Sequence, residues 1–419
     1  MTTDRKVLAI VAAAPSPYRV HQHLRIAREL GDQVELWSVF LSEHNWQPWS
    51  TPLPEEIRPV ILGRGRAALG RKRGLNRLRE WGRGADAIQW LRDRRADVVI
   101  TAGYHDLGLM RLIAWCHKTG TPNYLFGDSN IHGDHARGVR RWIKQRYVGW
   151  AVRNVNGLLP CGEYGRQYFE QYGGRDKPTF FMPHEPDYTK IFDVTAEQRA
   201  AVQQKFGLRS DRRYFLYSGR LAPVKRVDTL IDAFARIAEQ RPGWDLLLIG
   251  GGPLEAELRS RVPQSLQGRV AWTGFINDSA ELSALYTCGD VFVLPSSYEP
   301  WAVVVCEAAA AGLPIVASRV VGAAGELCRE GVNGRLFTPG DVDDLGKVLL
   351  DVTSSGTQLA AFSRGSLAVL DDWRRRGDPV QGVRLVLAHA GLLPPPPPVE
   401  PDPPTPQTRS GASVANLSS

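Results

Sequence analysis

The chain of 419 residues contains no long apolar run. A helix that crosses a membrane needs ~18–20 predominantly apolar residues. The most apolar stretch here, residues 302–317, is interrupted by Glu307, Gly312 and Pro314. We therefore expect no transmembrane helix. A short apolar run near the N-terminus follows Asp4 and precedes no clear processing site, which favours a first buried strand over a signal peptide.

Cysteine is scarce, and the cysteines that are present form no CxxC pair. The five positions are Cys116, Cys161, Cys288, Cys306 and Cys328. An odd number of scattered cysteines argues against a disulfide framework and against a zinc site. We expect a protein of the reducing cytoplasm, either free there or at the inner face of the membrane.

Negative charge is scarce in the first half of the chain. The net charge is +8, and residues 1–190 hold 29 Lys and Arg against 19 Asp and Glu, which leaves 23 against 25 for the rest. A basic surface attracts an anionic partner. Composition leaves open a membrane surface, a phosphorylated acceptor or nucleic acid. No nucleic-acid-binding module is recognisable, so we expect no nucleic acid to be bound.

Apolar runs alternate with amphipathic stretches through the first half. We predict strands at residues 6–13, 34–40, 97–100 and 122–126, and helices at 18–30, 75–95 and 107–118. Short buried strands that alternate with helices indicate a parallel, doubly wound α/β sheet. Residues 44–74 break the pattern, and we expect a long loop there.

The same alternation starts again near Tyr214. Strands are predicted at residues 214–218, 245–249, 269–272, 291–294 and 314–317, and helices at 225–240, 254–261, 280–286 and 303–311. We expect two Rossmann-like domains, residues 1–190 and 191–355, with ligands between the carboxyl ends of their sheets. Residues 356–392 are expected to form helices that could cross back to the first domain. The proline-rich residues 393–419 cannot bury a core and are expected to be disordered.

Basic residues follow the first strand of the second domain. Gly219 and Arg220 end that strand, and Lys225 lies near the start of the next helix. Glycine permits a tight turn, and a helix N-terminus favours negative charge. The segment therefore suits a diphosphate, with ordinary solvated loop cations as the open alternative. Phe275 and Ile276 follow the third strand, where a flat base could rest on the loop or Phe275 could belong to the core.

Two acids are separated by eight positions around the motif Pro-Ser-Ser-Tyr-Glu-Pro-Trp. Glu299 lies in this motif, and Glu307 lies on a helix that we expect to begin at Trp301 and Ala302. Eight helical residues span ~12 Å, a separation that suits two carboxylates binding hydroxyl-rich ends of one ligand. The N–H groups of Ala302 and Val303 could meet a phosphate or sugar oxygen. A buried charge needs partners, so a structural ion pair stays open.

These motifs, in this order and spacing, resemble the C-terminal domain of family 4 glycosyltransferases. That family has the GT-B fold and retains the anomeric configuration of the sugar. The resemblance covers about residues 212–355 and includes a small-residue loop that ends in Glu326, although Ala323 replaces a usual glycine. The opening segment Pro-Ser-Pro-Tyr-Arg is similar to that of one branch of the family.

The resemblance implies a role for each residue in a nucleotide-sugar site. Arg220 and Lys225 would hold the diphosphate, Glu299 the transferred sugar and Glu307 the ribose, while the base would rest near Phe275. We find no DxD-like metal signature that needs a divalent ion, so we expect electrostatic stabilisation of the leaving diphosphate without a metal or cofactor. The donor-binding candidates are Gly219, Arg220, Lys225, Phe275, Ile276, Glu299, Trp301, Ala302, Val303 and Glu307. Glu299 is also a catalytic candidate.

Acceptor candidates follow the predicted strands of the first domain. Ser16 and Arg19 stand in the opening Pro-Ser-Pro-Tyr-Arg segment, and Asp128 follows a later strand. His105 also follows a strand, at a place where relatives often carry a polar residue that contacts the acceptor or the reacting sugar. We therefore include His105 among both the acceptor-binding and the catalytic candidates. Plain caps and a structural histidine remain open.

Residues 137–153 are predicted to form a helix with a basic side. Its apolar side chains share one stripe: Val139, Trp142, Ile143, Tyr147 and Trp150. We favour an ordinary surface helix whose stripe packs in the core, with an interfacial helix on an anionic membrane as the alternative. The basic run at 64–79 is a second patch of the same kind.

The sequence thus predicts a hexosyltransferase that uses a nucleotide sugar. Its acceptor is expected to be a glycan, a lipid-linked molecule or a small molecule, by analogy in the assembly of cell-surface glycan or exopolysaccharide. Two other classes stay open: a GT-B epimerase or phosphorylase, and a nucleotide-sugar-binding protein without activity. Product analysis distinguishes them, because an epimerase needs no acceptor.

Overall fold

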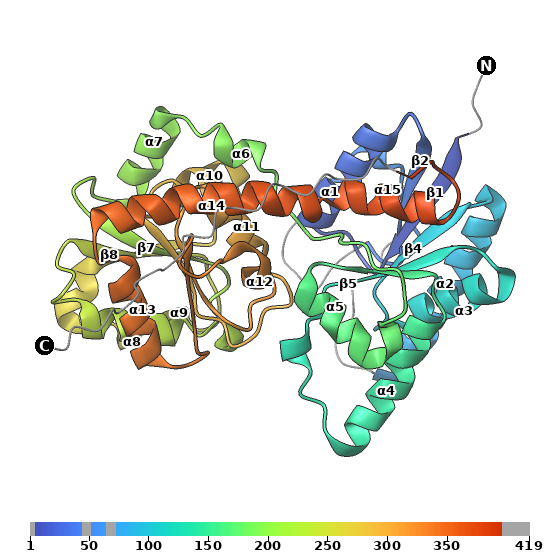
Figure 1. Ribbon diagram of the computed structural model, residues 1–419, viewed down its shortest axis with the longest axis horizontal. Helices are drawn as coiled ribbons and strands as arrows, with labels where there is room; N and C mark the ends of the chain where they lie inside the picture. The colour runs from blue at the N-terminus through green and yellow to red at the C-terminus, as the bar shows by residue number, and fades with distance from the viewer. Residues whose placement is uncertain (1–4, 44–51, 64–72, 396–419) are drawn as a thin grey trace, which may run out of the picture.

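The computed structural model describes residues 5–43, 52–63 and 73–395. Figure 1 shows two α/β domains side by side, joined along one edge by two consecutive helices. Most of the basic run at 64–79 and nearly all of the proline-rich tail lie outside the described residues. Within the described part of the chain, no helix combines the length and the apolar character needed to cross a bilayer.

The first domain is built on a six-stranded parallel sheet with the order β3-β2-β1-β4-β5-β6. Its strands are β1 (Lys6–Ala12), β2 (Val34–Phe40), β3 (Pro59–Ile61), β4 (Val98–Ala102), β5 (Asn123–Gly127) and β6 (Gly157–Pro160). The four strands that we predicted are confirmed within two residues. The predicted long loop at 44–74 is wrong in one part, because the short edge strand β3 lies within it.

Helices cover both faces of this sheet, which explains why its strands are apolar throughout. They are α1 (Pro17–Leu30), α2 (Arg73–Arg94), α3 (Leu107–Thr119), α4 (Gly138–Arg153) and α5 (Glu163–Phe169). Along β1, Leu8 and Ile10 belong to the buried cluster that contains Ile26 of α1. The alternate residue Val11 belongs to a second cluster, which contains Leu109 of α3.

The second domain repeats the same design with the order β12-β11-β10-β7-β8-β9. Its strands are β7 (Arg213–Ser218), β8 (Trp244–Ile249), β9 (Val270–Gly274), β10 (Val291–Leu294), β11 (Ile315–Ser318) and β12 (Gly334–Phe337). Its helices include α6 (Thr189–Phe192), α7 (Ala196–Phe206), α8 (Val227–Ile237), α9 (Glu255–Arg261), α10 (Ser279–Tyr286), α11 (Val303–Ala310), α12 (Ala324–Leu327) and α13 (Val342–Val352). Numbered within each domain, both sheets have the order 3-2-1-4-5-6, so each has a switch point beside its first strand.

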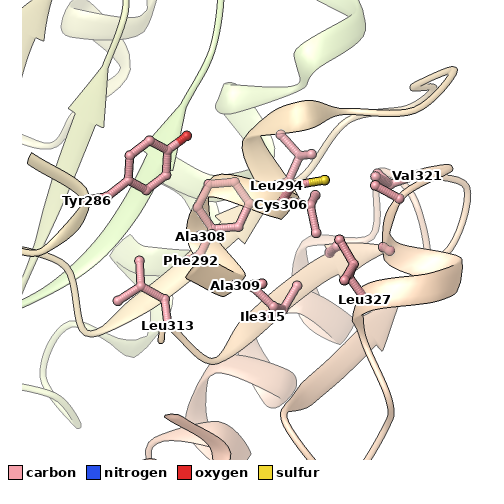
Figure 2. Close-up of a cluster of buried hydrophobic side chains, with 14 of the residues drawn as sticks. Tyr286, Phe292, Leu294, Cys306, Ala308, Ala309, Leu313, Ile315, Val321 and Leu327 are labelled. Atoms are coloured by element: carbon pink, nitrogen blue, oxygen red, sulfur yellow. The ribbon is translucent and has the colours of Figure 1, made fainter. Parts of the chain in front are cut away.

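The core of the second domain holds α11 against the centre of the sheet. Figure 2 shows Cys306, Ala308 and Ala309 of this helix beside Phe292 of β10 and Ile315 of β11. The small alanine side chains let the helix lie close to the sheet. This packing fixes the position of the loop that precedes α11, where the predicted site lies.

The chain passes between the domains twice, at neighbouring places. The first passage, residues 183–188, leads from the first domain to α6. The second leads from α14 (Gly356–Arg376), which packs on α11 and α12, to α15 (Pro379–His389), which packs on α1 of the first domain (Figure 1). Arg25 of α1 joins the passages, because its Nη1 lies 2.5 Å from Glu185 and 2.9 Å from Asp378.

Helix α4 differs from the prediction. The favoured interpretation placed its apolar stripe in the core, yet Val139, Trp142 and Ile143 are 73%, 62% and 54% exposed. The buried residues of α4 lie in its last turns, between Val148 and Val152. The helix is anchored by its C-terminal half only, so the first turns project beyond the domain (Figure 1).

The contact between α14 and the domain interface gives a test of the fold. Trp373 is 1% exposed, and its ring centroid lies 5.7 Å from those of both Trp301 and Phe181. We expect Trp373→Ala to lower the free energy of unfolding by about 3–5 kcal/mol, measured by urea denaturation with circular dichroism. Leu367→Ala, on the same helix but 46% exposed, should change it by about 0.5 kcal/mol or less. Equal midpoints for the two variants would contradict this account.

Candidate functional site

The predicted site residues gather at the carboxyl ends of the strands of the second domain. There the loops after β7 and β8 touch through their backbones. Gly219 and Gly250 have φ angles of +153° and +125°, and a Cβ atom on Gly250 would lie 2.0 Å from the carbonyl oxygen of Gly219. Only glycine fits at this contact. The turn that carries Arg220 is therefore fixed against the next loop of the sheet.

Lys225 and Glu299 meet in this region, although 74 positions separate them. Lys225 ends a short 3₁₀ helix (Pro223–Lys225), and its ammonium group forms an ion pair with Oε1 of Glu299. The Ser296 hydroxyl donates to the same oxygen at 2.8 Å. Glu299 is only 6% exposed, so these two donors compensate a charge that burial would otherwise destabilise.

Arg220 is exposed beside this pair. Among the described residues, no carboxylate or carbonyl partner is found for its guanidinium group. The loop of Lys225 is tied to the loop of Glu299 by Ser297, whose backbone N–H donates to the Val224 carbonyl at 2.9 Å. The structure thus pairs Lys225 with Glu299, while Arg220 lies in the same loop, five positions before Lys225, with its guanidinium group uncompensated among the described residues.

Glu307 is the second acid of the motif, and its environment differs. Its Oε2 accepts a hydrogen bond from the Tyr286 hydroxyl at 2.7 Å, and burial raises the pKa of its carboxyl group to about 7. Tyr18 of the first domain lies close to it, since the carboxylate is the largest cause of the raised pKa of the Tyr18 phenol. A residue from the first domain therefore lies near Glu307, a contact that the sequence did not predict.

Helix α11 starts at Val303, the first residue of the predicted range 303–311, and Trp301 and Ala302 precede it. Ala302 has a φ angle of +82°, a conformation that non-glycine residues rarely adopt. Among the described residues, no acceptor pairs with the backbone N–H groups of Ala302 and Val303. These groups are therefore available to an acceptor from outside the protein.

Trp301 has a different role from the one predicted. Its indole is 3% exposed, donates to the His184 carbonyl at 2.8 Å and packs on Trp373. The structure gives this side chain a packing role between the domains, which the sequence did not predict, while the predicted donor contact of Trp301 stays a prediction. By contrast, Phe275 is 57% exposed and Ile276 is half-buried on the loop after β9, as an accessible platform requires.

The acceptor candidates lie on the facing loops of the first domain. Ser16 caps α1 without a side-chain bond, and Arg19 donates to the Ala14 carbonyl at 2.8 Å. Burial lowers the pKa of Arg19, and Asp128 opposes that effect, so the two lie near each other. Asp128 also lines a narrow crevice between the domains, to which Pro300 of the second domain contributes.

His105 follows β4 and lies against the Tyr104 ring, with the ring centroids 4.4 Å apart. Desolvation lowers the pKa of its imidazole, which favours the neutral ring. A neutral imidazole can accept a proton or a hydrogen bond. In the described residues, no group of three or more His, Cys, Asp or Glu side chains is placed to hold a metal ion.

Sequence reasoning missed Asn130 and Tyr298, which meet across the interface. Asn130 was part of the segment after β5, where only Asp128 was singled out, and Tyr298 lies inside the motif of Glu299. The sequence shows only that both residues follow predicted strands. Their meeting depends on how the two domains are placed relative to each other, which the sequence pattern does not give.

Comparison with known proteins indicates the family. A family model described as "Glycosyl transferases group 1" matches residues 198–366. A mannosylfructose-phosphate synthase of Agrobacterium fabrum is 32% identical over 190 residues, which are 43% of this chain and 41% of that protein. A GDP-mannose-dependent α-(1-6)-phosphatidylinositol monomannoside mannosyltransferase of Mycolicibacterium smegmatis is 30% identical over 278 residues, 61% of this chain and 71% of that protein. The match thus spans about two fifths of the first relative's length.

Solved structures show the same arrangement of domains. The crystal structure of the Anabaena protein HepE in complex with UDP superimposes with a TM-score of 0.71, at 20% identity, over 93% of this chain and 100% of that one. A sucrose-phosphate synthase of Thermosynechococcus elongatus gives a TM-score of 0.70 at 17% identity, over 89% and 96% of the two chains. The predicted fold class is confirmed: the chain has two Rossmann-like domains in the GT-B arrangement.

The raised pKa of Glu307 predicts how stability depends on pH. The pKa in the folded state is about 7, above the usual 4.5, so the folded protein holds the proton more tightly and loses stability as the pH rises from about 4.5 to 7. Glu307→Gln keeps an acceptor for Tyr286 without this loss. We expect the melting temperature of the variant, relative to wild type, to increase from pH 5 to pH 8 in scanning fluorimetry.

Two controls isolate this effect. Glu185, whose pKa burial also raises to about 7, is present in both proteins and cancels in the difference. Glu257→Gln makes the same change at an exposed position of α9 and should show no such trend. A difference between Glu307→Gln and wild type that stays constant with pH would contradict the burial of an ionisable Glu307.

Proposed function

Because the chain belongs to the group 1 glycosyltransferases, we propose that it transfers a hexose-type sugar from a nucleotide sugar to a hydroxyl acceptor. One observation carries the proposal: Arg220, Lys225, Glu299 and Glu307 surround the carboxyl edge of one sheet, with free backbone N–H groups between the two acids. Cations suit a diphosphate, and carboxylates suit the hydroxyl groups of a sugar and a ribose.

We infer the following roles at this site. Arg220 is free to bind a diphosphate oxygen, and Lys225 can turn one donor toward it while keeping its contact with Glu299. Glu299 accepts hydrogen bonds from the transferred sugar, and Glu307 accepts them from the ribose. The exposed Phe275 and the half-buried Ile276 support the base. Arg19, Asp128 and His105 face the acceptor from the first domain.

The proposed reaction retains the configuration of the sugar. The bond between the anomeric carbon and the diphosphate oxygen breaks, and a bond from that carbon to the acceptor oxygen forms on the same face. The proton of the acceptor hydroxyl passes to the leaving diphosphate. Arg220 and the free N–H groups of Ala302 and Val303 stabilise the charge that develops on the diphosphate. This scheme requires no metal, so we expect transfer to persist in EDTA.

The acceptor is proposed to be a glycan or a lipid-linked molecule. The Mycolicibacterium relative bears the name of an enzyme that acts on a phosphatidylinositol monomannoside, which makes a lipid-borne hydroxyl a reasonable first choice.

A panel of UDP-, GDP-, ADP- and dTDP-sugars identifies the donor by thermal shift, because a bound ligand stabilises the folded state. Release of an altered sugar without an acceptor would indicate an epimerase instead.

Glu299 gives the direct test of the proposed site. Glu299→Gln keeps the size of the side chain but removes the charge that binds the sugar and pairs with Lys225. We expect transfer from the selected nucleotide sugar to fall about 100-fold or more, in line with the loss of one preorganised polar group, measured by labelled sugar incorporation. Glu239→Gln, at an exposed position of the same domain, should keep full activity. Wild-type rates in Glu299→Gln would remove Glu299 from the site.

We propose that helix α4 docks on an anionic membrane. Beside the exposed Val139, Trp142 and Ile143 lie four exposed arginines: Arg137, Arg140, Arg141 and Arg146. None of their guanidinium groups forms an ion pair with the described residues. Apolar side chains inserted among lipid headgroups, with arginines beside anionic phosphates, are the features of an interfacial helix. Such docking would hold the protein at the inner face of the membrane.

The neighbouring helix extends this surface. Leu78 and Trp81, in the early turns of α2, are 72% and 49% exposed. Arg77 lies near α4, since its charge lowers the pKa of the Tyr147 phenol against the larger effect of burial. Two helices of the first domain thus present exposed apolar and basic side chains close together, which is consistent with a lipid surface as the partner.

Vesicle flotation tests this docking. Wild type should float with vesicles that contain phosphatidylglycerol and remain behind with pure phosphatidylcholine, and added salt should release it. Trp142→Ser with Ile143→Ser should reduce flotation about tenfold, because each exposed apolar group contributes to insertion. Leu367→Ser, which removes an exposed apolar side chain from α14, is the matched control. Equal flotation of all three proteins would contradict a role for α4.

A further inference from the structure

The loop of Glu299 is held by a residue from the opposite domain. Asn130 follows β5 in the first domain and is 1% exposed. Its Nδ2 donates to the carbonyl oxygens of Glu299, Pro300 and Val320 at 2.6, 3.2 and 3.3 Å. These carbonyls belong to the two loops after β10 and β11 of the second domain. One amide group thus binds two loops of the candidate site from across the interface.

The Oδ1 atom of the Asn130 side chain makes a hydrogen bond within its own domain. Its Oδ1 accepts the backbone N–H of His132 at 2.9 Å and caps the short 3₁₀ helix Ile131–Gly133. This bond fixes the side-chain rotamer, so the Nδ2 group points toward the second domain before the loops arrive. The side chain is therefore preorganised as a donor.

Tyr298 makes a second contact at the same place. Its phenol lies near the backbone of Asn130, which lowers the pKa of the phenol against the larger effect of burial, and its ring lies against Gly133. A Cβ atom on Gly133 would be 2.3 Å from Cζ of Tyr298 and 2.4 Å from its hydroxyl oxygen. The ring can lie there only because residue 133 has no side chain. The 298–300 segment is thus held by both a polar and a steric contact.

The carbonyl that Asn130 binds belongs to the residue whose carboxylate is central to the site. The Glu299 carbonyl also accepts the Gly322 N–H, from its own domain, at 3.2 Å. The two donors approach the same oxygen from different domains. When the domains separate, the Gly322 bond can remain, whereas the Asn130 bonds and the Tyr298 contact are lost. The main chain at Glu299 is therefore fully constrained only in the closed arrangement.

We propose that Asn130 is a positioning residue that couples closure of the two domains to the orientation of Glu299. The proposal rests on the proposed function, because it assigns Glu299 to the transferred sugar. Residues that we assign to the nucleotide lie in the second domain, so the donor binds to the open form. Closure then brings the acceptor loops near and sets the Glu299 backbone. Catalysis is thereby restricted to the closed state, in which water is excluded.

Asn130→Asp tests the coupling with little change of shape. Aspartate keeps the Oδ1 acceptor and caps a helix as well as asparagine does, but it places an oxygen against three carbonyl oxygens. We expect kcat to fall at least tenfold, while the dissociation constant of the selected nucleotide sugar, measured by calorimetry, changes less than about threefold. A residue with a merely structural role would lower the melting temperature and affect binding and turnover together.

Asn156→Asp is the matched control. It makes the same substitution in the same domain, but at the amino end of β6, whereas Asn130 lies beyond the carboxyl end of β5. Its Oδ1 only accepts, from the backbone N–H of Asn123 at 2.9 Å, so aspartate keeps that bond. This variant should match wild type in kcat, in binding and in scattering. Wild-type kcat in Asn130→Asp, with the control behaving as stated, would overturn the proposal.

A double-mutant cycle tests the steric part. Gly133→Ala should lower kcat about tenfold, because its methyl group meets the Tyr298 ring. In a Tyr298→Ala background the same Gly133→Ala change should have less than a twofold effect, since the clash is gone. Independent, additive losses in the two backgrounds would show that Gly133 acts elsewhere, which would overturn the assigned contact.

Small-angle scattering separates the proposal from the proposed function. The contact belongs to the closed arrangement, so Asn130→Asp and Gly133→Ala should populate that arrangement less and have larger radii of gyration than the wild type. This result is independent of activity. If the wild type transferred no sugar but the variants opened, the proposed function would fail and the coupling by Asn130 would stand. If neither variant opened, the coupling would fail even with an active enzyme.

Discussion

A carboxylate that is buried beside one ammonium group governs the arrangement of the site. Removing two charges from water costs several kcal/mol for each ion before their attraction offsets it, so Lys225 and Glu299 depend on each other and on the Ser296 hydroxyl. The loops that carry them must therefore remain in register. Ser297 links these loops, and glycines at 219 and 250 let the neighbouring turn approach closely. A diphosphate would enter a site whose charges are already placed.

The two acids of the motif are prepared for different tasks. Glu299 is charge-compensated by a cation. Within the described residues, the Tyr286 phenol is the one hydrogen-bond donor to the Glu307 carboxylate, and burial raises the pKa of Glu307 to about 7. A carboxylate that is costly to ionise gains most from additional hydroxyl donors. Hydrogen bonds from a diol such as a ribose would therefore stabilise this carboxylate more than they would stabilise an exposed one.

Local pattern predicted much of this molecule, and long-range contact explains the remainder. Strands such as β1 and β8 are largely apolar and flanked by turn residues, so their positions were predictable within two residues. The edge strand β3 has only three residues and little pattern of its own. The interface role of Trp301 and the donor role of Asn130 were not predictable, because each depends on atoms more than 70 positions away. The exposed stripe of α4 was misjudged for a related reason: helical periodicity identifies an apolar face without identifying what covers it.

The two neighbouring passages of chain have a mechanical consequence. A single flexible connection would let the domains twist and slide freely, but two neighbouring connections define a hinge axis. The ion pairs of Arg25 with Glu185 and Asp378 hold both connections near α1. The motion that remains is a hinge rotation of one domain relative to the other. Each closure then returns the facing loops to the same relative orientation, which two freely tumbling domains would have to find by a search.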